Sequence, residues 1–126
     1  MGHGKVFVVD DDRSVRKGLG RLIRAGGYEV ELLADAASYL ACSVPTTPAC
    51  LVLDIRMPGM SGLELQTAIG GTPLALPVVF ITGHGDEDVR KQALASGAVD
   101  VLFKPLDEAT LFVAIDRALA VPRRTS

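Results

Sequence analysis

The chain has 126 residues, of which 48% are hydrophobic and 22% charged, and these proportions exclude a disordered protein and indicate a single folded domain. Its net charge of −2 argues against nucleic acid as the partner of this domain, because binding to a phosphate backbone needs a basic excess. The apolar runs are too short to span a membrane and no charged-then-apolar leader precedes them, so we expect a cytoplasmic protein with no membrane partner.

The first half of the chain predicts three strands and two helices. Residues 6–9 form an apolar run that ends at three consecutive aspartates, and a helix with one apolar stripe follows over residues 13–25. Residues 28–33 alternate apolar and acidic side chains, as a strand near a sheet edge does, and Asp35 is placed to cap a short helix after it. Residues 50–53 form the third predicted strand.

The second half continues the alternation. The predicted elements are a helix over 63–69, a strand over 78–81, a helix capped by Asp86 that reaches Ser96, a strand over 99–103, and a helix capped by Asp107 that reaches about residue 120. Uninterrupted apolar runs are typical of strands covered on both faces, so the pattern predicts an α/β fold, a doubly wound sheet of five parallel strands with five helices. Because aromatic residues make up only 5% of the chain, we expect a core of Val, Leu, Ile and Ala.

Polar side chains follow four of the five predicted strands. They are Asp10 and Asp11 after the first strand, Asp54 after the third, Thr82 after the fourth and Lys104 after the fifth. Each has an ordinary explanation by itself, such as helix capping or a solvated surface. In a sheet of order 2-1-3-4-5, however, right-handed crossovers make these strands neighbours and bring their carboxyl ends together. The pattern therefore predicts a pocket of three carboxylates with a hydroxyl and an ammonium on its rim.

The predicted pocket suits phosphoryl transfer. Three crowded carboxylates repel one another unless a proton or a cation neutralises them, and all-oxygen ligands open to water favour Mg²⁺. The carboxylate of Asp54 could attack phosphorus to form an acyl phosphate. Mg²⁺, the Lys104 ammonium and the Thr82 hydroxyl would then cover the equatorial oxygens of the transferred group. We therefore predict a catalytic set of Asp54, Thr82 and Lys104.

Four ordered blocks of the sequence resemble the signature of response-regulator receiver domains, which have the flavodoxin-like (CheY-like) fold. The blocks are VVDDD at 8–12, LVLDIRMPGMSG at 51–62, ITGHGD at 81–86 and FKP at 103–105. The ITGHGD and GAVD segments are particularly similar to the FixJ-like subfamily of two-component transcription regulators. The resemblance covers roughly residues 5–120.

The resemblance implies a role for each residue that matches the motifs. Asp54 matches the phosphoryl acceptor, and Mg²⁺ would be held by Asp11, Asp54 and the backbone carbonyl of Arg56. Asp10 matches the neighbouring acid that acts on the metal through water. Thr82 and Lys104 match the pair that contacts the phosphoryl group, and the bond from Lys104 to its proline is expected to be cis.

The resemblance also implies partners and domain limits. The phosphoryl donor would be a sensor histidine kinase, and the chain would catalyse only its own phosphorylation and dephosphorylation, so it would not be an enzyme with a separate substrate. A phosphorylated homodimer through the fourth helix and fifth strand is expected, with DNA bound only through an output domain outside this chain. Residues 1–4 are interpreted as a disordered start or an expression addition, 5–120 as the receiver domain, and 121–126 as a tail or the start of a linker.

One position departs from the resembled pattern. Three residues before Lys104 the family usually has Tyr or Phe, which swings inward as Thr82 moves toward the phosphate, and here Val101 stands there. A valine is short and stiff at χ1, so it cannot sweep out the volume of a ring. Leu102 is expected on the opposite face of the sheet and is no substitute. The sequence predicts phosphorylation with weak or atypical coupling to the output face.

Other functions remain open at this stage. A phosphatase with an aspartate nucleophile would want a second Asp where Arg56 stands, and a nucleotide-binding module would need a phosphate loop where the chain has three acids. The alternative function is a stand-alone or phosphorylation-independent receiver-like binding module with an atypical switch. The first helix also carries basic residues opposite its apolar stripe, which form either a solvated face or a docking surface for the kinase. These residues are Arg13, Arg16, Lys17, Arg21 and Arg24.

Overall fold

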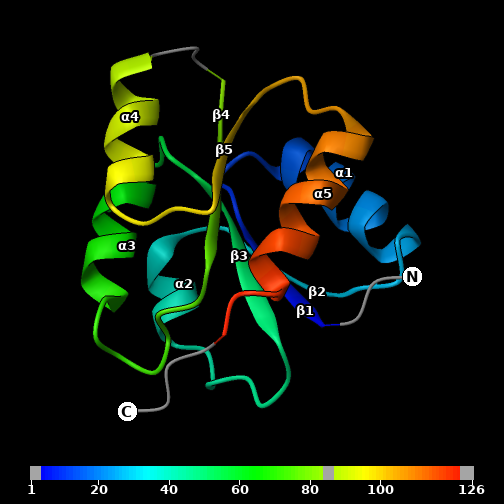
Figure 1. Ribbon diagram of the computed structural model, residues 1–126, viewed down its shortest axis with the longest axis horizontal. Coiled ribbons are helices and arrows are strands. Elements are labelled where there is room, and N and C mark those ends of the chain that lie inside the picture. Colours follow the sequence, from blue (N-terminus) through cyan, green and yellow to red (C-terminus); the bar gives the residue numbers. More distant parts are fainter. Residues whose placement is uncertain (1–3, 84–86, 123–126) are drawn as a thin grey trace.

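Five strands alternate with five helices in the computed structural model, which describes residues 4–83 and 87–122 (Figure 1). The strands are β1 (Lys5–Val9), β2 (Glu29–Leu33), β3 (Ala49–Asp54), β4 (Val78–Thr82) and β5 (Asp100–Phe103). The helices are α1 (Arg13–Ala25), α2 (Ala36–Leu40), α3 (Gly62–Ile69), α4 (Glu87–Ala95) and α5 (Glu108–Leu119). The predicted alternation of five strands with five helices is confirmed. No helix among the described residues is long and apolar enough to cross a membrane.

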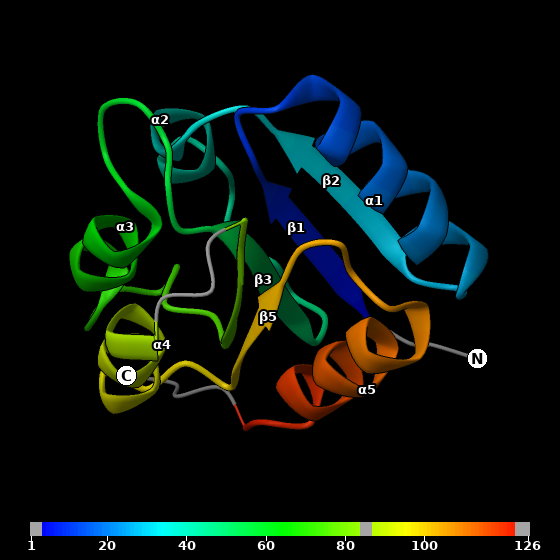
Figure 2. The same ribbon diagram turned by 90° about the horizontal axis from the view of Figure 1, so that it is seen from above.

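The strands form one parallel sheet in the order β2-β1-β3-β4-β5, as predicted. The strand that alternates apolar and acidic residues, β2, is at one edge, and β5 is at the other. Viewed from above, α1 and α5 lie on one side of the sheet and α2, α3 and α4 lie on the other (Figure 2). This order places β1, β3, β4 and β5 side by side, with their carboxyl ends at one edge.

The core has two layers, one on each face of the sheet. One layer packs α2, α3 and α4 against β-strand side chains, and the other packs α1 and α5. All six residues of β3 are buried, which explains its uninterrupted apolar run. The expectation of a purely aliphatic core was wrong, because Phe7, Tyr39 and Phe80 are fully buried. The rings of Phe7 and Tyr39 meet edge to face with centroids 5.5 Å apart.

Side-chain caps begin the helices that follow the strands. Asp12 caps α1, and the predicted caps Asp35 and Asp107 are confirmed at α2 and α5. Ser61 and Glu64 form a reciprocal capping box at the start of α3, which the sequence analysis did not foresee. The predicted cap of the fourth helix, at position 86, lies outside the described residues. These caps fix where each helix leaves the edge of the sheet that carries the polar strand ends.

Candidate functional site

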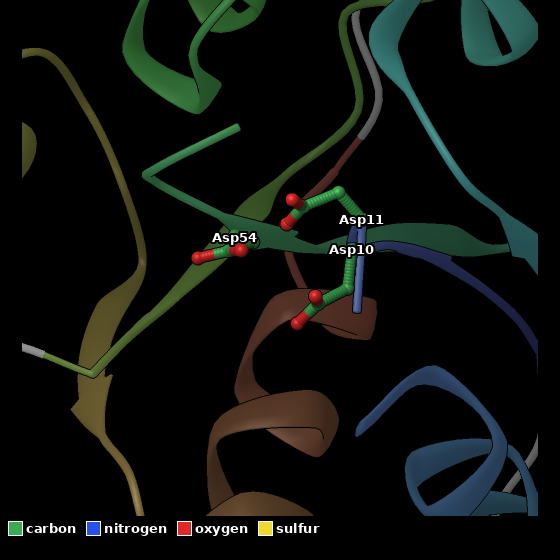
Figure 3. A group of neighbouring side chains, drawn as sticks. All are labelled: Asp10, Asp11 and Asp54. Atoms are coloured by element: carbon green, nitrogen blue, oxygen red, sulfur yellow. The ribbon is translucent and has the colours of Figure 1, made fainter. Parts of the chain in front are cut away.

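Three carboxylates meet at the carboxyl ends of β1 and β3. Val9 of β1 pairs with Leu53 of β3 in the parallel register. Asp10 and Asp54, the next residue after each, therefore lie beside each other. One oxygen from each of Asp10, Asp11 and Asp54 lies within 4.8 Å of the others, and Figure 3 draws the three side chains at these strand ends. Asp10 and Asp54 are 0% and 5% exposed, whereas Asp11 is open to solvent. This is an oxygen-only site with one side facing water.

Every oxygen of Asp10 accepts a hydrogen bond from the protein. Its Oδ1 accepts from the backbone N–H of Asp12 at 2.8 Å, and its Oδ2 accepts from Nζ of Lys104 at 3.3 Å. The backbone carbonyl of Asp10 accepts from Nη1 of Arg16 at 2.8 Å. A buried carboxylate is tolerated only when it is paired or hydrogen-bonded, and these contacts meet that demand. They also fix the orientation of Asp10 before any ligand arrives.

Asp54 is the acid most perturbed by this environment. The pKa of Asp54 is raised to about 7. Burial is the main cause and the negative charge of Asp10 the next, the Lys104 ammonium and the Arg56 N–H act in the opposite direction, and Asp11 adds a small upward effect. The Arg56 N–H donates to Oδ1 of Asp54 at 3.3 Å. The cluster is therefore short of positive charge near neutral pH. Because its donors are carboxylates and it opens to water on one side, it fits a hard divalent cation such as Mg²⁺.

The structure also brings the two rim residues to this edge. Thr82 ends β4 and is 2% exposed, and Lys104 follows β5 with its ammonium at the carboxylates. The Lys104 N–H donates to the carbonyl of Thr82 at 2.8 Å, which ties the ends of β4 and β5 together. The bond between Lys104 and Pro105 is cis, as predicted. All five polar residues predicted from the strand ends thus lie at one edge of the sheet.

Two residues important for this geometry were missed from the sequence. Arg16 was interpreted only as part of a basic helix face, but its side chain is half-buried and reaches the Asp10 carbonyl. Gly62 was noted only as the last residue of the signature block at 51–62, but a Cβ at that position would lie 2.4 Å from the backbone oxygen of Asp54. The MSG segment before α3 was the available signal for Gly62, since a glycine at a helix start beside a buried strand end suggests close backbone approach.

Val101 lies on the face of the sheet that packs against α4. It is 4% exposed and belongs to the same apolar layer as Ala93 of α4. Leu102 is in the other layer, with α5, as predicted. A hollow of about 460 Å³ lies along the outer edge of β5, lined by Val101 and Arg90 among others. There is thus open space beside the small side chain where the family usually carries a ring.

Comparison with known proteins gives consistent matches. The family model of the response regulator receiver domain matches residues 6–116. Nodulation protein W of Bradyrhizobium diazoefficiens is 42% identical over 119 residues, which are 94% of this chain and 52% of that protein. The chain spans about half the length of the curated relatives it matches.

Solved structures agree with the sequence matches. The response regulator StyR superposes with a TM-score of 0.84 at 47% identity, covering 92% of this chain and 59% of that one. The structure of FixJ-N superposes with a TM-score of 0.88 at 35% identity, covering 99% of this chain and all of that one. With four signature blocks, the sheet order and these matches in agreement, the chain belongs to the response regulator receiver domain family and resembles its FixJ-like members.

Proposed function

We propose that the chain is a phosphorylation switch in which Asp54 accepts a phosphoryl group from a sensor histidine kinase in the presence of Mg²⁺. The observation that carries this proposal is the meeting of Asp10, Asp11 and Asp54 within 4.8 Å, with the Lys104 ammonium 3.3 Å from Asp10. A buried acid beside two others and a lysine has no evident structural purpose, since it raises the free energy of the folded state.

Each residue of the site has a part in the proposed reaction. An oxygen of Asp54 attacks phosphorus, the bond from phosphorus to the donor breaks, and the donor leaves with the electron pair. Asp11, Asp54 and the Arg56 carbonyl would hold Mg²⁺, with Asp10 acting through water, and the ion would neutralise charge on the phosphoryl oxygens. The Lys104 ammonium and the Thr82 hydroxyl bind the remaining oxygens. Lys104 therefore exchanges its contact with Asp10 for one with the phosphoryl group.

The wider protein is part of the same proposal. Residues 5–120 form the receiver domain, and the segment from 121 leads toward an output domain that regulates transcription. The interpretation of the first residues concerns 1–3, which lie outside the described residues. The greater length of the relatives supports this division. DNA would be bound only by that output domain, and the phosphorylated receiver would form a homodimer through α4 and β5. The receiver catalyses only its own phosphorylation and dephosphorylation.

Intact mass spectrometry tests this function. The protein is incubated with Mg²⁺ and acetyl phosphate, and we expect one phosphoryl adduct on the wild type. The adduct should be absent from Asp54→Ala and from a wild-type sample without Mg²⁺, because the acceptor or the neutralising charge is missing. A folded wild type with no adduct would reject the proposal and favour a phosphorylation-independent binding module.

The valine at position 101 should weaken the response to phosphorylation. We expect phosphorylated Val101→Tyr to dimerise at a several-fold lower concentration than the phosphorylated wild type, because a ring beside β5 can change position with Thr82 and a valine cannot. Sedimentation equilibrium measures both dimers, and the unphosphorylated variant controls for association through the added ring alone. Equal dimerisation of the two phosphorylated proteins would show that Val101 does not limit the switch.

A further inference from the structure

We infer that Arg16 is a positioning residue for the acidic site, which it holds in place from α1 through the backbone of Asp10. This inference rests on the proposed function, in which Asp10 and Asp11 serve a Mg²⁺ site. The inference is supported by a 2.8 Å hydrogen bond from Nη1 of Arg16 to the carbonyl oxygen of Asp10. The signature blocks at 8–12, 51–62, 81–86 and 103–105 do not include Arg16, and its helical spacing placed it on a basic face that is either solvated or a docking surface.

Arg16 differs from its basic neighbours on α1. Arg13, Lys17, Arg21 and Arg24 are exposed, whereas Arg16 is partly buried against the loop that follows β1. The first turn of α1 contains no acidic residue. A cation near the amino end of a helix is disfavoured by the helix dipole, so helix stability alone does not account for an arginine there. A nearby cluster of carboxylates and a carbonyl acceptor does account for it.

The contact acts on two acids at once. The Asp10 carbonyl and the Asp11 N–H belong to one rigid peptide plane, so a bond that fixes this carbonyl also fixes where the Cα of Asp11 lies. Among the described residues, no hydrogen bond to the Asp11 carboxylate is found, and this exposed side chain depends on its backbone for placement. Arg16 therefore orients the acid before the peptide bond and the acid after it.

The contact also persists through the proposed reaction. Of the three donors to Asp10, Lys104 leaves when the phosphoryl group arrives, whereas the Asp12 N–H and the Arg16 guanidinium have no other part in the reaction. After transfer these two contacts remain to keep Asp10 facing the metal. A guanidinium suits this task because it stays protonated and its planar donors keep a fixed direction.

Two measurements test the inference with Arg16→Ala, Arg16→Lys and Lys17→Ala. In the metal-free protein, exchange of the Asp12 amide reports whether the loop holds its geometry. We expect faster exchange at Asp12 in Arg16→Ala, with the β3 amides unchanged. By calorimetry we expect the Mg²⁺ dissociation constant of Arg16→Ala to rise about 10-fold, the lower end of the range for outer groups that orient metal ligands. Arg16→Lys should recover most of both values, and Lys17→Ala should match the wild type.

Amide exchange at Asp12 and Mg²⁺ affinity can each overturn the positioning role of Arg16. If Arg16→Ala matches the wild type in Asp12 exchange and in Mg²⁺ affinity, the inference is overturned and Arg16 belongs to the solvated or docking face. If Arg16→Ala does not fold, Arg16→Met and Arg16→Lys are compared, and equal Mg²⁺ affinities overturn it. If the wild type binds no Mg²⁺, the proposed function fails, while the Asp12 amide still reports on the contact itself.

Discussion

Replacing Asp54 with Asn should stabilise the metal-free protein at pH 8 by as much as about 4 kcal/mol, because the raised pKa of about 7 corresponds to a carboxylate that the folded state holds at a penalty. The main cause is burial, followed by the charge of Asp10. An amide of the same shape carries no charge and avoids both effects. Chemical denaturation of the two proteins in the presence of a chelator measures the difference.

The pH dependence of this difference follows from the direction of the shift. The folded-state pKa of Asp54 lies above its unfolded value, so the wild type has the full stability contribution of Asp54 below about pH 4, where this group is protonated in both states. It loses that stability as the pH rises toward 7, where the folded protein also loses the proton. The gain from Asp54→Asn should therefore be largest at pH 8 and close to zero at pH 4. A gain that stays constant with pH would contradict this account.

The second large effect is expected at Gly62, where an alanine should destabilise the protein by about 3 kcal/mol, the upper part of the range for overpacking. The added Cβ would lie 2.4 Å from the Asp54 carbonyl oxygen and 3.0 Å from the Cα of Ile55. Both neighbours are backbone atoms of the buried strand end, so neither can rotate away. Relief requires α3 to move from the end of β3, which would displace Asp54 and slow the proposed phosphorylation. Denaturation and the mass assay measure the two effects.

Gly18 in α1 provides a matched control. It is exposed, and a Cβ there would meet nothing within 4 Å. Gly18→Ala should therefore stabilise the protein by about 0.5–1 kcal/mol, the usual gain from replacing glycine in a helix. Opposite signs for the two substitutions would attribute the loss at Gly62 to the close approach of the Asp54 backbone. A loss at both positions would indicate a helix effect instead.

Most of the fold followed from local sequence patterns. Continuous apolar runs marked the buried strands. With right-handed crossovers and the order 2-1-3-4-5 expected for this fold, the edge that gathers Asp10, Asp54, Thr82 and Lys104 could be predicted from the residue after each strand. The apolar runs and the polar residues that follow them are formed by residues adjacent in the sequence, so both can be found without the structure.

The features that escaped prediction depend on distances between separate elements. The reach of Arg16 to the Asp10 carbonyl depends on how α1 is rotated against the loop before it, and its helical spacing hid it among exposed bases. The approach of Gly62 to β3 depends on the entry angle of α3. Tyr39 could be buried because its hydroxyl donates to the carbonyl of Leu74 at 2.7 Å, a partner 35 positions away. Composition and periodicity carry no record of such distances.

The position of Asp54 at the end of β3 anchors the candidate site on the best protected strand of the sheet. β3 is the central strand and is wholly buried, so its hydrogen bonds should break only when the whole molecule unfolds. β5 has four residues and a single neighbouring strand, and its end is tied to the site through the hydrogen bond from the Lys104 N–H to the Thr82 carbonyl. Substitutions on the exposed surface of β5 that keep Lys104 and this hydrogen bond should therefore change the surface chemistry of the domain while the acidic site keeps its geometry.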